Sequence, residues 1–499
     1  MSKKKNFPSS EGVRGFRDLR GSVLSARKQA VQILSDIYEA YGFEALETPV
    51  IETAEALGKF LPDVDRPAGG VFGFQDDDER WLALRYDLTA PLARFVAHYD
   101  QHLPKPFKRY QTGSVFRNEK PGPGRFREFH QFDADIVGTA AMTADAELCA
   151  MLSEGLQALG IKSDEYVINI NNRKLLTAVF EVAGLSGDDD ATFQKRAIAF
   201  RAIDKLDRLG EAGVKALLGA GRKDASGDFT EGAGLSDAQT DIILAFTRAR
   251  GGDNNQTLEA CRALLGENET GQTGLVELEK MFEMIDASCS NSQNMVFNPA
   301  IVRGLGYYTG PVFEAELTFD VQNEKGKVVQ FGSVAGGGRY DDLVARFTGR
   351  TVPATGVSIG LDRLLTALEN RGALKSEQEN LGPVIVTIMD RDRIADYARI
   401  AHELRAAGIK TELYLGEAGF KAQMKYADRR HAPIAVIQGS DESAKGEVLL
   451  KDLHLGMMMA DKAHTHEEWR HNEDVQKLVS QNDIVSAVRA MLERIKNRV

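Results

Sequence analysis

Residues 114–138 (SVFRNEKPGPGRFREFHQFDADIVG) constrain the fold more than any other segment, because they combine a loop signal with an alternating strand pattern. Residues 121–124 (PGPG) favour a loop, since proline has no backbone donor and glycine tolerates positive φ. We expect a first strand to open at Val115 and Phe116. A second strand should begin near Arg125, where side chains alternate with a period of two. The segment therefore predicts a β-hairpin.

The two faces of the second expected strand differ in chemistry. Alternate side chains of a strand point to the same face of its sheet. One face carries Arg127, Phe129, Gln131, Asp133 and Asp135, and the other, more apolar face carries Phe126, His130, Phe132, Ala134 and Ile136. We expect the first face to form the floor of a site for a charged and polar ligand.

Two arginines flank the expected turn. Arg117 and Glu119 lie two residues apart and should share a face of the first strand, while Arg125 follows the turn. Guanidinium groups spaced around a tight hairpin suit a polyphosphate, because arginine presents a rigid bidentate fork. A salt-bridged surface hairpin is the alternative interpretation of the same spacing.

Composition sets the class of protein. The length of 499 residues suggests two to four domains, and 43% hydrophobic with 27% charged residues is typical of a globular protein. A net charge of −11 gives no global basic field for nucleic acid, although local patches remain compatible with RNA binding. Cys149, Cys261 and Cys289 lack C-x-x-C spacing, which argues against disulfides and structural zinc. With no apolar run long enough to span a membrane, we expect a cytoplasmic protein.

The chain before and after the hairpin alternates strand and helix signals. Residues 22–41 predict an amphipathic helix that Gly42 ends, and residues 43–52 predict a strand. Residues 81–96 predict a strand that turns into a helix with Thr89 as its N-cap. Residues 169–300 are rich in helix formers, so we expect a helical insertion there.

The second half returns to polar motifs. Arg303 precedes a glycine, and Tyr307 and Tyr308 precede a turn and a strand. Residues 333–340 (SVAGGGRY) predict a glycine-rich turn, which lacks the Lys-Ser/Thr of a phosphate-binding P-loop. Residues 355–368 predict a strand that runs into a helix, with Arg363 in its first turn.

The C-terminal part predicts a separate domain. Residues 372–382 are polar and charged, as in a linker, and the βαβαβ order that follows predicts a parallel sheet. His464, His466 and His471 lie among acidic residues without cysteine, which favours a solvated loop over a metal site.

These motifs resemble class II aminoacyl-tRNA synthetases, and among them the histidyl-tRNA synthetases. Phe-Arg-x-Glu, a loop and Arg-x-Arg-x-Phe-x-Gln resemble motif 2, with the His130-Gln131 ending typical of the histidyl family. Residues 84–89 (LRYDLT), 303–308 (RGLGYY) and 333–340 resemble histidine-binding motifs, although Gly306 stands where most members have Asp. Residues 360–363 (GLDR) resemble motif 3, and residues 22–52 resemble motif 1, the dimer element.

The resemblance implies an α/β fold class. Its α+β catalytic core would be an antiparallel sheet flanked by helices. Residues 1–168 and 301–374 would form this core, 169–300 a helical insertion domain, and 383–499 a C-terminal α/β anticodon-binding domain. The implied activity is that of a ligase that forms histidyl-adenylate from histidine and ATP, with Mg2+, and passes the histidyl group to the 3′ end of tRNA(His). The implied partners are L-histidine, ATP, tRNA(His) and a second copy of the chain in a homodimer, with no membrane.

The resemblance also assigns roles to residues. Arg117 and Arg303 would be catalytic at the α-phosphate. ATP would be bound by Arg117, Glu119, Arg125, Phe129 and Arg363. Histidine would be bound by Asp87, Leu88, Thr89, Arg117, Gln131, Asp135, Arg303, Tyr307, Tyr308 and Tyr340, with Asp135 accepting from the imidazole. No metal-ligating side chain is assigned.

Two other functions are compatible with part of the pattern. A synthetase-like regulatory subunit of ATP phosphoribosyltransferase binds histidine without activating it, but usually lacks the anticodon domain and has degraded motifs. An RNA-binding scaffold with an inactive site is disfavoured by the four arginines. Neither the identity bases of the tRNA, nor a need for an extra 5′ nucleotide, nor the effect of Gly306 follows from the sequence.

Overall fold

The computed structural model describes residues 9–57, 70–121, 125–187, 189–223, 227–302, 308–322, 328–371, 381–455 and 475–498. The chain divides into two compact units, Met1–Ala373 and Leu374–Val499. In the described residues no helix is long and apolar enough to cross a membrane.

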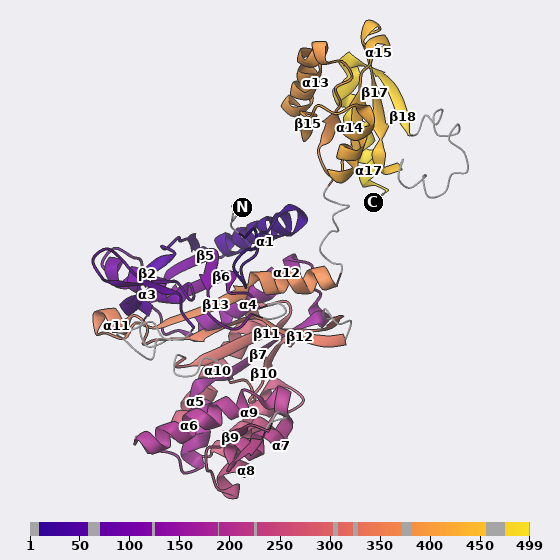
Figure 1. The fold of residues 1–499 in the computed structure, drawn as a ribbon. Helices are drawn as coiled ribbons and strands as arrows, with labels where there is room; N and C mark the ends of the chain where they lie inside the picture. The colour runs from indigo at the N-terminus through magenta and orange to yellow at the C-terminus, as the bar shows by residue number, and fades with distance from the viewer. Residues whose placement is uncertain are drawn as a thin grey trace. The chain divides into compact units, whose positions relative to one another are not determined.

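An eight-stranded sheet organises the first unit (Figure 1). The strand order is β1-β5-β6-β13-β12-β11-β7-β10. All neighbours pair antiparallel except β1 with β5 and β10 with β7 at the two edges. The strands are β1 (Glu44–Ala45), β5 (Phe107–Phe116), β6 (Glu128–Val137), β7 (Tyr166–Asn172), β10 (Met295–Phe297), β11 (Pro311–Gln322), β12 (Val328–Arg339) and β13 (Ala354–Gly360). The expected antiparallel sheet is confirmed.

The apolar face of β6 is buried under helices. The helices that pack on this part of the sheet are α1 (Gly21–Ala40), α4 (Met142–Ala158) and α12 (Leu361–Asn370). Phe132 is fully buried, with its ring 5.0 Å from that of Tyr38 on α1 and stacked 5.6 Å from that of Tyr110 on β5. The alternation predicted for this strand is therefore confirmed, and the opposite face is left for the site.

The hairpin differs from the expectation at its start. β5 and β6 pair from Phe107 opposite Val137 to Phe116 opposite Glu128. The first strand thus ends, rather than opens, at Phe116, because residues from Phe107 onward already pair with β6. Arg117 and Glu119 consequently lie beyond the strand, and residues 122–124 of the turn lie outside the described residues.

The prediction of a glycine-rich turn at residues 333–340 is wrong, because residues 333–339 belong to the strand β12. The glycines serve strand packing instead of a turn. A Cβ at Gly337 would collide with the carbonyl oxygen of Gly356 on β13 and with the ring of Phe313 on β11. The next expected element is confirmed, since β13 runs directly into α12 with Arg363 in its first turn.

Smaller elements border the sheet. A three-stranded sheet has the order β2-β4-β3, and the expected strand at 43–52 is split in two around Pro49. Thr89 is not the N-cap of α3. It is the first helical residue, and the Asp87 carboxylate accepts hydrogen bonds from the backbone of Thr89 (3.1 Å) and Ala90 (2.9 Å). The bounds are β2 (Ile51–Thr53), α2 (Ala54–Leu57), β3 (Gly73–Gln75), β4 (Trp81–Leu84), α3 (Thr89–Tyr99) and α11 (Ala345–Thr348).

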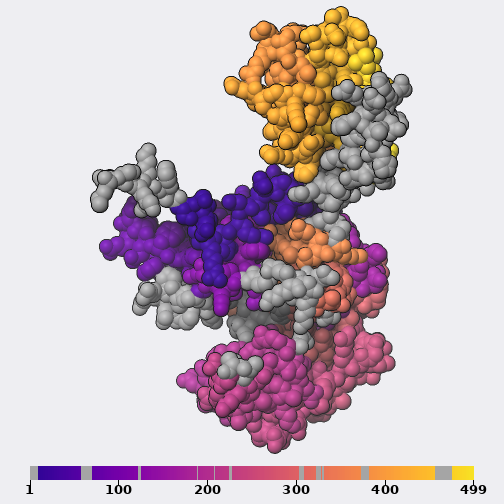
Figure 2. All heavy atoms as spheres, turned by 45° about the vertical axis from the view of Figure 1, so that its right-hand side comes forward, coloured from indigo at the N-terminus to yellow at the C-terminus, as the bar shows by residue number. Residues whose placement is uncertain are grey.

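Residues 169–300 are mostly helical and gather at one end of the first unit (Figure 2). Both ends of the segment belong to the main sheet, through β7 and β10. Between them lie α5 (Arg173–Val182), α6 (Asp190–Ile203), α7 (Leu206–Leu218), α8 (Asp237–Thr247), α9 (Asn254–Leu265) and α10 (Glu269–Ser288), with a short hairpin of β8 (Gly221–Lys223) and β9 (Phe229–Glu231).

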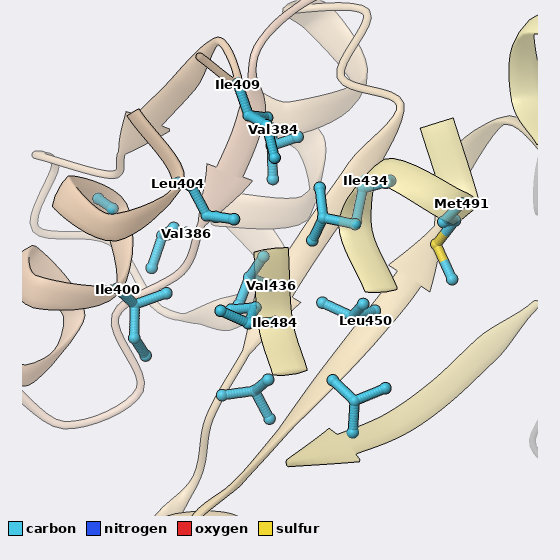
Figure 3. Close-up of a cluster of buried hydrophobic side chains, with 14 of the residues drawn as sticks. Val384, Val386, Ile400, Leu404, Ile409, Ile434, Val436, Leu450, Ile484 and Met491 are labelled. Atoms are coloured by element: carbon cyan, nitrogen blue, oxygen red, sulfur yellow. The ribbon is translucent and has the colours of Figure 1, made fainter. Parts of the chain in front are cut away.

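The second unit has a five-stranded sheet of order β15-β14-β16-β17-β18. β14 pairs parallel with β15 and β16, which confirms the βαβαβ prediction, and β17 and β18 continue antiparallel. Strand and helix side chains such as Val386, Ile400 and Ile484 form its core (Figure 3). The elements are β14 (Val384–Val386), α13 (Ile394–Ala406), β15 (Thr411–Leu413), α14 (Phe420–Arg429), β16 (Ile434–Ile437), α15 (Ser440–Ala444), β17 (Glu447–Asp452), β18 (Gln476–Ser480) and α17 (Ile484–Lys496). His464, His466 and His471 lie outside the described residues.

The close approach at Gly337 leads to a stability prediction. Gly337→Ala should lower the free energy of unfolding by about 1–3 kcal/mol, because backbone and a buried ring must move to admit the methyl group. Gly336→Ala is the matched control, since its Cβ would meet only the carbonyl oxygen of Phe313 at 3.6 Å. Denaturant unfolding followed by circular dichroism measures both, and equal stabilities for the two variants would contradict the packing role.

Candidate active site

A cavity of about 580 Å³ lies on the face of the sheet opposite to Phe132. Its walls come from the connection after β5 and from β6, β12, β13 and the start of α12. The described lining residues are Arg117, Glu119, Arg125, Phe126, Phe129, Gln131, Tyr308, Ser333, Val334, Ala335, Gly336, Gly337, Ser358, Gly360, Asp362 and Arg363. All five residues that the sequence assigned to ATP are among them. We call this space the large cavity.

Arg117 is held between two aromatic rings in the large cavity. Its guanidinium carbon lies 4.5 Å from the ring centroid of Tyr86 and 5.1 Å from that of Phe129. Its Nε is buried and has no hydrogen-bond partner among the described residues. The hydroxyl of Tyr86 also donates to the Glu119 carboxylate at 3.3 Å. Tyr86 thus orients two predicted site residues, and sequence reasoning gave it no role.

The first turn of α12 forms another part of the wall of the large cavity. Arg363 donates from Nη2 to the carbonyl oxygen of Phe331 at 2.8 Å, with its guanidinium carbon 5.1 Å from the Phe331 ring centroid. Asp362 precedes Arg363 and also lines the cavity, and its carboxylate accepts from the backbone N–H of His130 at 2.7 Å. Asp362 therefore joins α12 to β6, a role that sequence reasoning missed.

A smaller pocket of about 140 Å³ adjoins the large cavity, and we call it the acidic pocket. Its described lining residues are Asp87, Thr89, Gln131, Asp133, Asp135, Tyr308, Gly336, Tyr340, Gly356, Val357 and Ser358. Gln131, Tyr308, Gly336 and Ser358 line both spaces. Among the described lining residues of the acidic pocket none carries a positive charge, so the pocket suits a cationic or N–H-rich group.

Most of the predicted histidine-binding residues meet in this pocket. Asp87, Thr89, Gln131, Asp135, Tyr308 and Tyr340 line it. Arg117 lines only the large cavity, and Leu88 is fully buried in the core. Arg303 and Tyr307 lie outside the described residues.

The carboxylate of Asp135 is held by two neighbours. Its Oδ2 lies 2.5 Å from Nη2 of Arg109, whose side chain is 0% exposed, and its Oδ1 accepts from the hydroxyl of Tyr340. Burial raises the pKa of Asp135, while Arg109 and then Tyr340 act to lower it. Register explains the pair, because Arg109 on β5 lies directly opposite Asp135 on β6. Sequence reasoning missed Arg109, although its position opposite Asp135 follows once the hairpin register is known.

Asp133 is the third carboxyl of the acidic pocket, and the sequence assigned it a face but no role. Its Oδ1 accepts from the hydroxyl of Ser358 at 2.5 Å, and that hydroxyl oxygen accepts from Nε2 of Gln131 at 2.8 Å. Its Oδ2 is buried without a hydrogen-bond partner among the described residues. Burial raises the pKa of Asp133 from 3.8 to about 7, against the opposing effect of Arg109 and with a further rise from Asp135.

Comparison with known proteins identifies the family. The profile described as "Histidyl-tRNA synthetase" matches residues 15–364, and that described as "Anticodon binding domain" matches residues 383–487. The chain belongs to the histidyl-tRNA synthetase family. It is 56% identical to a protein named histidine--tRNA ligase from Cereibacter sphaeroides, over 97% of this chain and 98% of that one.

Two further relatives agree with this family. A histidine--tRNA ligase from Jannaschia sp. is 55% identical over 99% of both chains. The crystal structure of a histidyl-tRNA synthetase from Nostoc sp. PCC 7120 superposes with a TM-score of 0.74 at 29% identity, covering 99% of this chain and 100% of that one. These family members match the chain through both of its units.

The raised pKa of Asp133 predicts a pH-dependent stability difference. Between pH 4 and about 7 the folded chain keeps a proton on Asp133 that the unfolded chain has released, so folding stability falls as pH rises. Asp133→Asn carries no charge at any pH. Its free energy of unfolding, relative to the native chain, should therefore increase from pH 5 to pH 8. Denaturant unfolding at both pH values tests this, and a difference that is constant with pH would contradict it.

Proposed function

We propose that this chain is a histidine–tRNA ligase that activates histidine in the acidic pocket with ATP bound in the large cavity. One observation carries the proposal beyond family membership. An arginine-lined cavity and a carboxyl-lined pocket meet at Gln131, Tyr308, Gly336 and Ser358. Reaction of an amino acid with ATP needs this arrangement. The carboxylate of the amino acid must reach the α-phosphate of ATP, while its positively charged amino group and its side chain lie in the acidic pocket.

Arg117 is the proposed catalytic residue at this junction. Attack of the histidine carboxylate on the α-phosphate brings two anions together, and fixed positive charge lowers the energy of the transition state. The rings of Tyr86 and Phe129 restrict the Arg117 guanidinium, so little reorganisation is needed. The same role proposed for Arg303 rests on the resemblance of residues 303–308 alone.

Other residues of the large cavity would bind the nucleotide. Phe129 and Arg363 would sandwich the adenine ring, and Glu119 would accept from its amino group. Arg125 and Arg363 would contact the outer phosphates. The support for these roles is that the four side chains line one cavity of about 580 Å³, a size that suits a nucleotide.

Mg2+ would enter with the nucleotide. Among the described residues no group of three or more His, Cys, Asp or Glu side chains could hold a metal ion. Glu119 and Asp362 are the acidic residues among the described lining of the large cavity, and Asp362 already accepts from the backbone N–H of His130. Mg2+ commonly keeps several water ligands and binds through substrate phosphates with only one or two carboxylates of the protein. There it would supply positive charge to the phosphates.

Histidine would lie with its α-amino group near Gln131, Asp87 and Thr89, and with its ring in the acidic pocket. Tyr308 would line the pocket, and Asp135 with Tyr340 would close its far end. Asp135 is paired with Arg109 and Tyr340, and its Oδ2, which has no hydrogen-bond partner among the described residues, would accept from the imidazole.

The remaining parts would serve tRNA and assembly. Residues 1–168 with 301–374 would be the catalytic core, 169–300 an insertion, and 383–499 the anticodon-binding domain.

A cytoplasmic homodimer is proposed through the motif-1 segment of α1 and β2. Val50 and Ile51 are 41% and 44% exposed there, which leaves an apolar surface for a second copy. A monomeric mass in solution would contradict the dimer.

The function predicts histidine-dependent exchange of pyrophosphate into ATP by the full chain. None of the other standard amino acids should support exchange at comparable concentration. The regulatory-subunit alternative predicts histidine binding without exchange, so the assay separates the two.

The same assay tests the division of labour between the units. A chain ending at residue 381 should keep exchange and bind tRNA more weakly than the full chain. Gel filtration of both forms controls for loss of the dimer. Unchanged tRNA affinity would refute the role of the second unit.

Arg117→Ala should slow adenylate formation by about 10²-fold or more, the effect of losing one preorganised donor. Arg117→Lys should restore only part of the rate, since a point charge cannot reproduce the guanidinium fork. Arg80→Ala is the matched control, because Arg80 is 67% exposed and pairs with Asp76 away from the described lining of both spaces. Single-turnover kinetics measures all three, and a normal rate for Arg117→Ala would leave this residue a structural role only.

A further inference from the structure

The side chain of Tyr86 contacts two residues of opposite charge that line the large cavity. The guanidinium carbon of Arg117 lies 4.5 Å from the centroid of its ring, and its hydroxyl donates to a carboxylate oxygen of Glu119 at 3.3 Å. Tyr86 itself is outside the described lining of both spaces. It therefore acts on the residues that would bind the nucleotide and not on the nucleotide directly.

The surrounding scaffold fixes Tyr86 independently of these two contacts. The side chain of the preceding residue, Arg85, is buried and donates to the carbonyl oxygens of Ser114 at 2.8 Å and Thr48 at 2.9 Å. The carbonyl oxygen of Arg85 accepts from the backbone N–H of Phe116 at 2.9 Å, which joins this segment to the end of β5. The Tyr86 ring packs on a buried apolar cluster made of Ala54, Leu57, Val71, Ala83 and Ala90. The ring therefore offers a fixed surface to both charged residues.

Arg117 and Glu119 have few other restraints. The Arg117 guanidinium has a further aromatic contact, the Phe129 ring at 5.1 Å, and its Nε has no hydrogen-bond partner among the described residues. Arg127 fixes the backbone of Glu119 by donating from Nε to its carbonyl oxygen at 3.0 Å. In the described part of the chain, however, the carboxylate of Glu119 accepts a hydrogen bond from Tyr86 alone, and no ion pair joins Glu119 to Arg117.

The side chains of Arg117 and Glu119, two residues apart, would ordinarily attract each other, because a guanidinium and a carboxylate form strong paired hydrogen bonds. Such a pair would take Arg117 away from the phosphate and Glu119 away from the base. Tyr86 offers both groups another partner, since the face of its ring attracts the guanidinium and its hydroxyl satisfies the carboxylate. Burial raises the pKa of Tyr86, while Arg117 acts to lower it and Glu119 to raise it, so the hydroxyl keeps its proton at neutral pH.

We propose that Tyr86 is a positioning residue that keeps Arg117 and Glu119 from pairing with each other. Its ring holds the guanidinium for the α-phosphate, and its hydroxyl holds the carboxylate for the amino group of adenine. The proposal rests on the proposed function and deepens it, because it assigns the rate and the selection of the base to separate parts of one side chain. Asp87 and Thr89, which follow in the chain, line the acidic pocket, so one short segment serves both ligands.

Single-turnover adenylate formation by the full-length chain tests the separation of the two charges. Tyr86→Leu removes the ring and the hydroxyl, so that Arg117 and Glu119 become free to pair. The rate should fall about 10-fold, the scale of losing a desolvated cation–π contact. Tyr99→Leu is the matched control and should keep the native rate, since Tyr99 is 43% exposed and lies outside the described lining of both spaces.

A second substitution distinguishes this role from a purely structural one. In the Tyr86→Leu background, Glu119→Gln should raise the rate of adenylate formation by about two- to fivefold at saturating ATP, the effect of removing an exposed ion pair. In the native background, where Tyr86 already keeps the two charges apart, Glu119→Gln should give no increase. A structural defect at Tyr86 would instead combine additively with the loss of Glu119.

Tyr86→Phe separates the hydroxyl from the ring. This variant keeps the packing of the ring and its contact with Arg117, so the rate at saturating ATP should stay within about twofold of the native rate. The preference for ATP over purine riboside 5′-triphosphate, which lacks the amino group, should fall about three- to tenfold, the effect of losing one hydrogen bond. The ratio of the kcat/KM values for the two nucleotides in histidine-dependent pyrophosphate exchange measures this preference.

The outcomes are distinct. Additive losses in the double variant, or an unchanged nucleotide preference in Tyr86→Phe, would overturn the proposed role of Tyr86. If Tyr86→Leu does not fold, the Tyr86→Phe comparison alone decides, because that variant retains the ring. If the native chain shows no histidine-dependent exchange, the proposed function itself fails. If the native chain is active and the variants behave like it, the function stands and the role of Tyr86 does not.

Discussion

The pairing of β6 with β5 on one side and β13 on the other is the constraint on which the site depends. Because both neighbours are fixed by backbone hydrogen bonds, each side chain of β6 has a determined direction. Phe132 points to the helices, and Asp133 and Asp135 point to the pocket. A shift of one residue in register would exchange the aromatic and acidic faces. The pairing of β6 with its two neighbours therefore determines which side chains enter the core and which line the acidic pocket.

Burial of carboxyl groups on this strand carries an energetic cost. A charge removed from water is tolerated when a partner of opposite charge and good hydrogen bonds surround it. Arg109 supplies the charge for Asp135, while Asp133 has only the hydroxyl of Ser358 as a donor in the described part of the chain, and burial raises the pKa of both carboxyl groups. The site thus contains two buried acids, each with an oxygen, Oδ2, that has no hydrogen-bond partner among the described residues. Unsatisfied oxygens of this kind are expected where a ligand completes the environment.

Local sequence patterns predicted most of the elements that position the site. The period of two on β6, the strand-to-helix transition at Arg363 and the C-terminal βαβαβ order are short-range signals, and the structure confirms them. The glycines at 336–338 were misassigned because a turn and a close contact between strands both require the absence of Cβ. Arg109 and Tyr86 were missed because their roles arise from pairing and stacking between segments far apart in sequence, which no local pattern reports.

The buried pair of Arg109 and Asp135 also restricts how this family can change. Replacing either residue alone leaves an unpaired charge in the interior, a loss of about 3–5 kcal/mol, which is a large part of the stability of an ordinary domain. An evolutionary path that alters one position must alter the other soon after, or pass through chains of much lower stability. Positions 109 and 135 should therefore change together, and an alignment of relatives should show them as a co-varying pair.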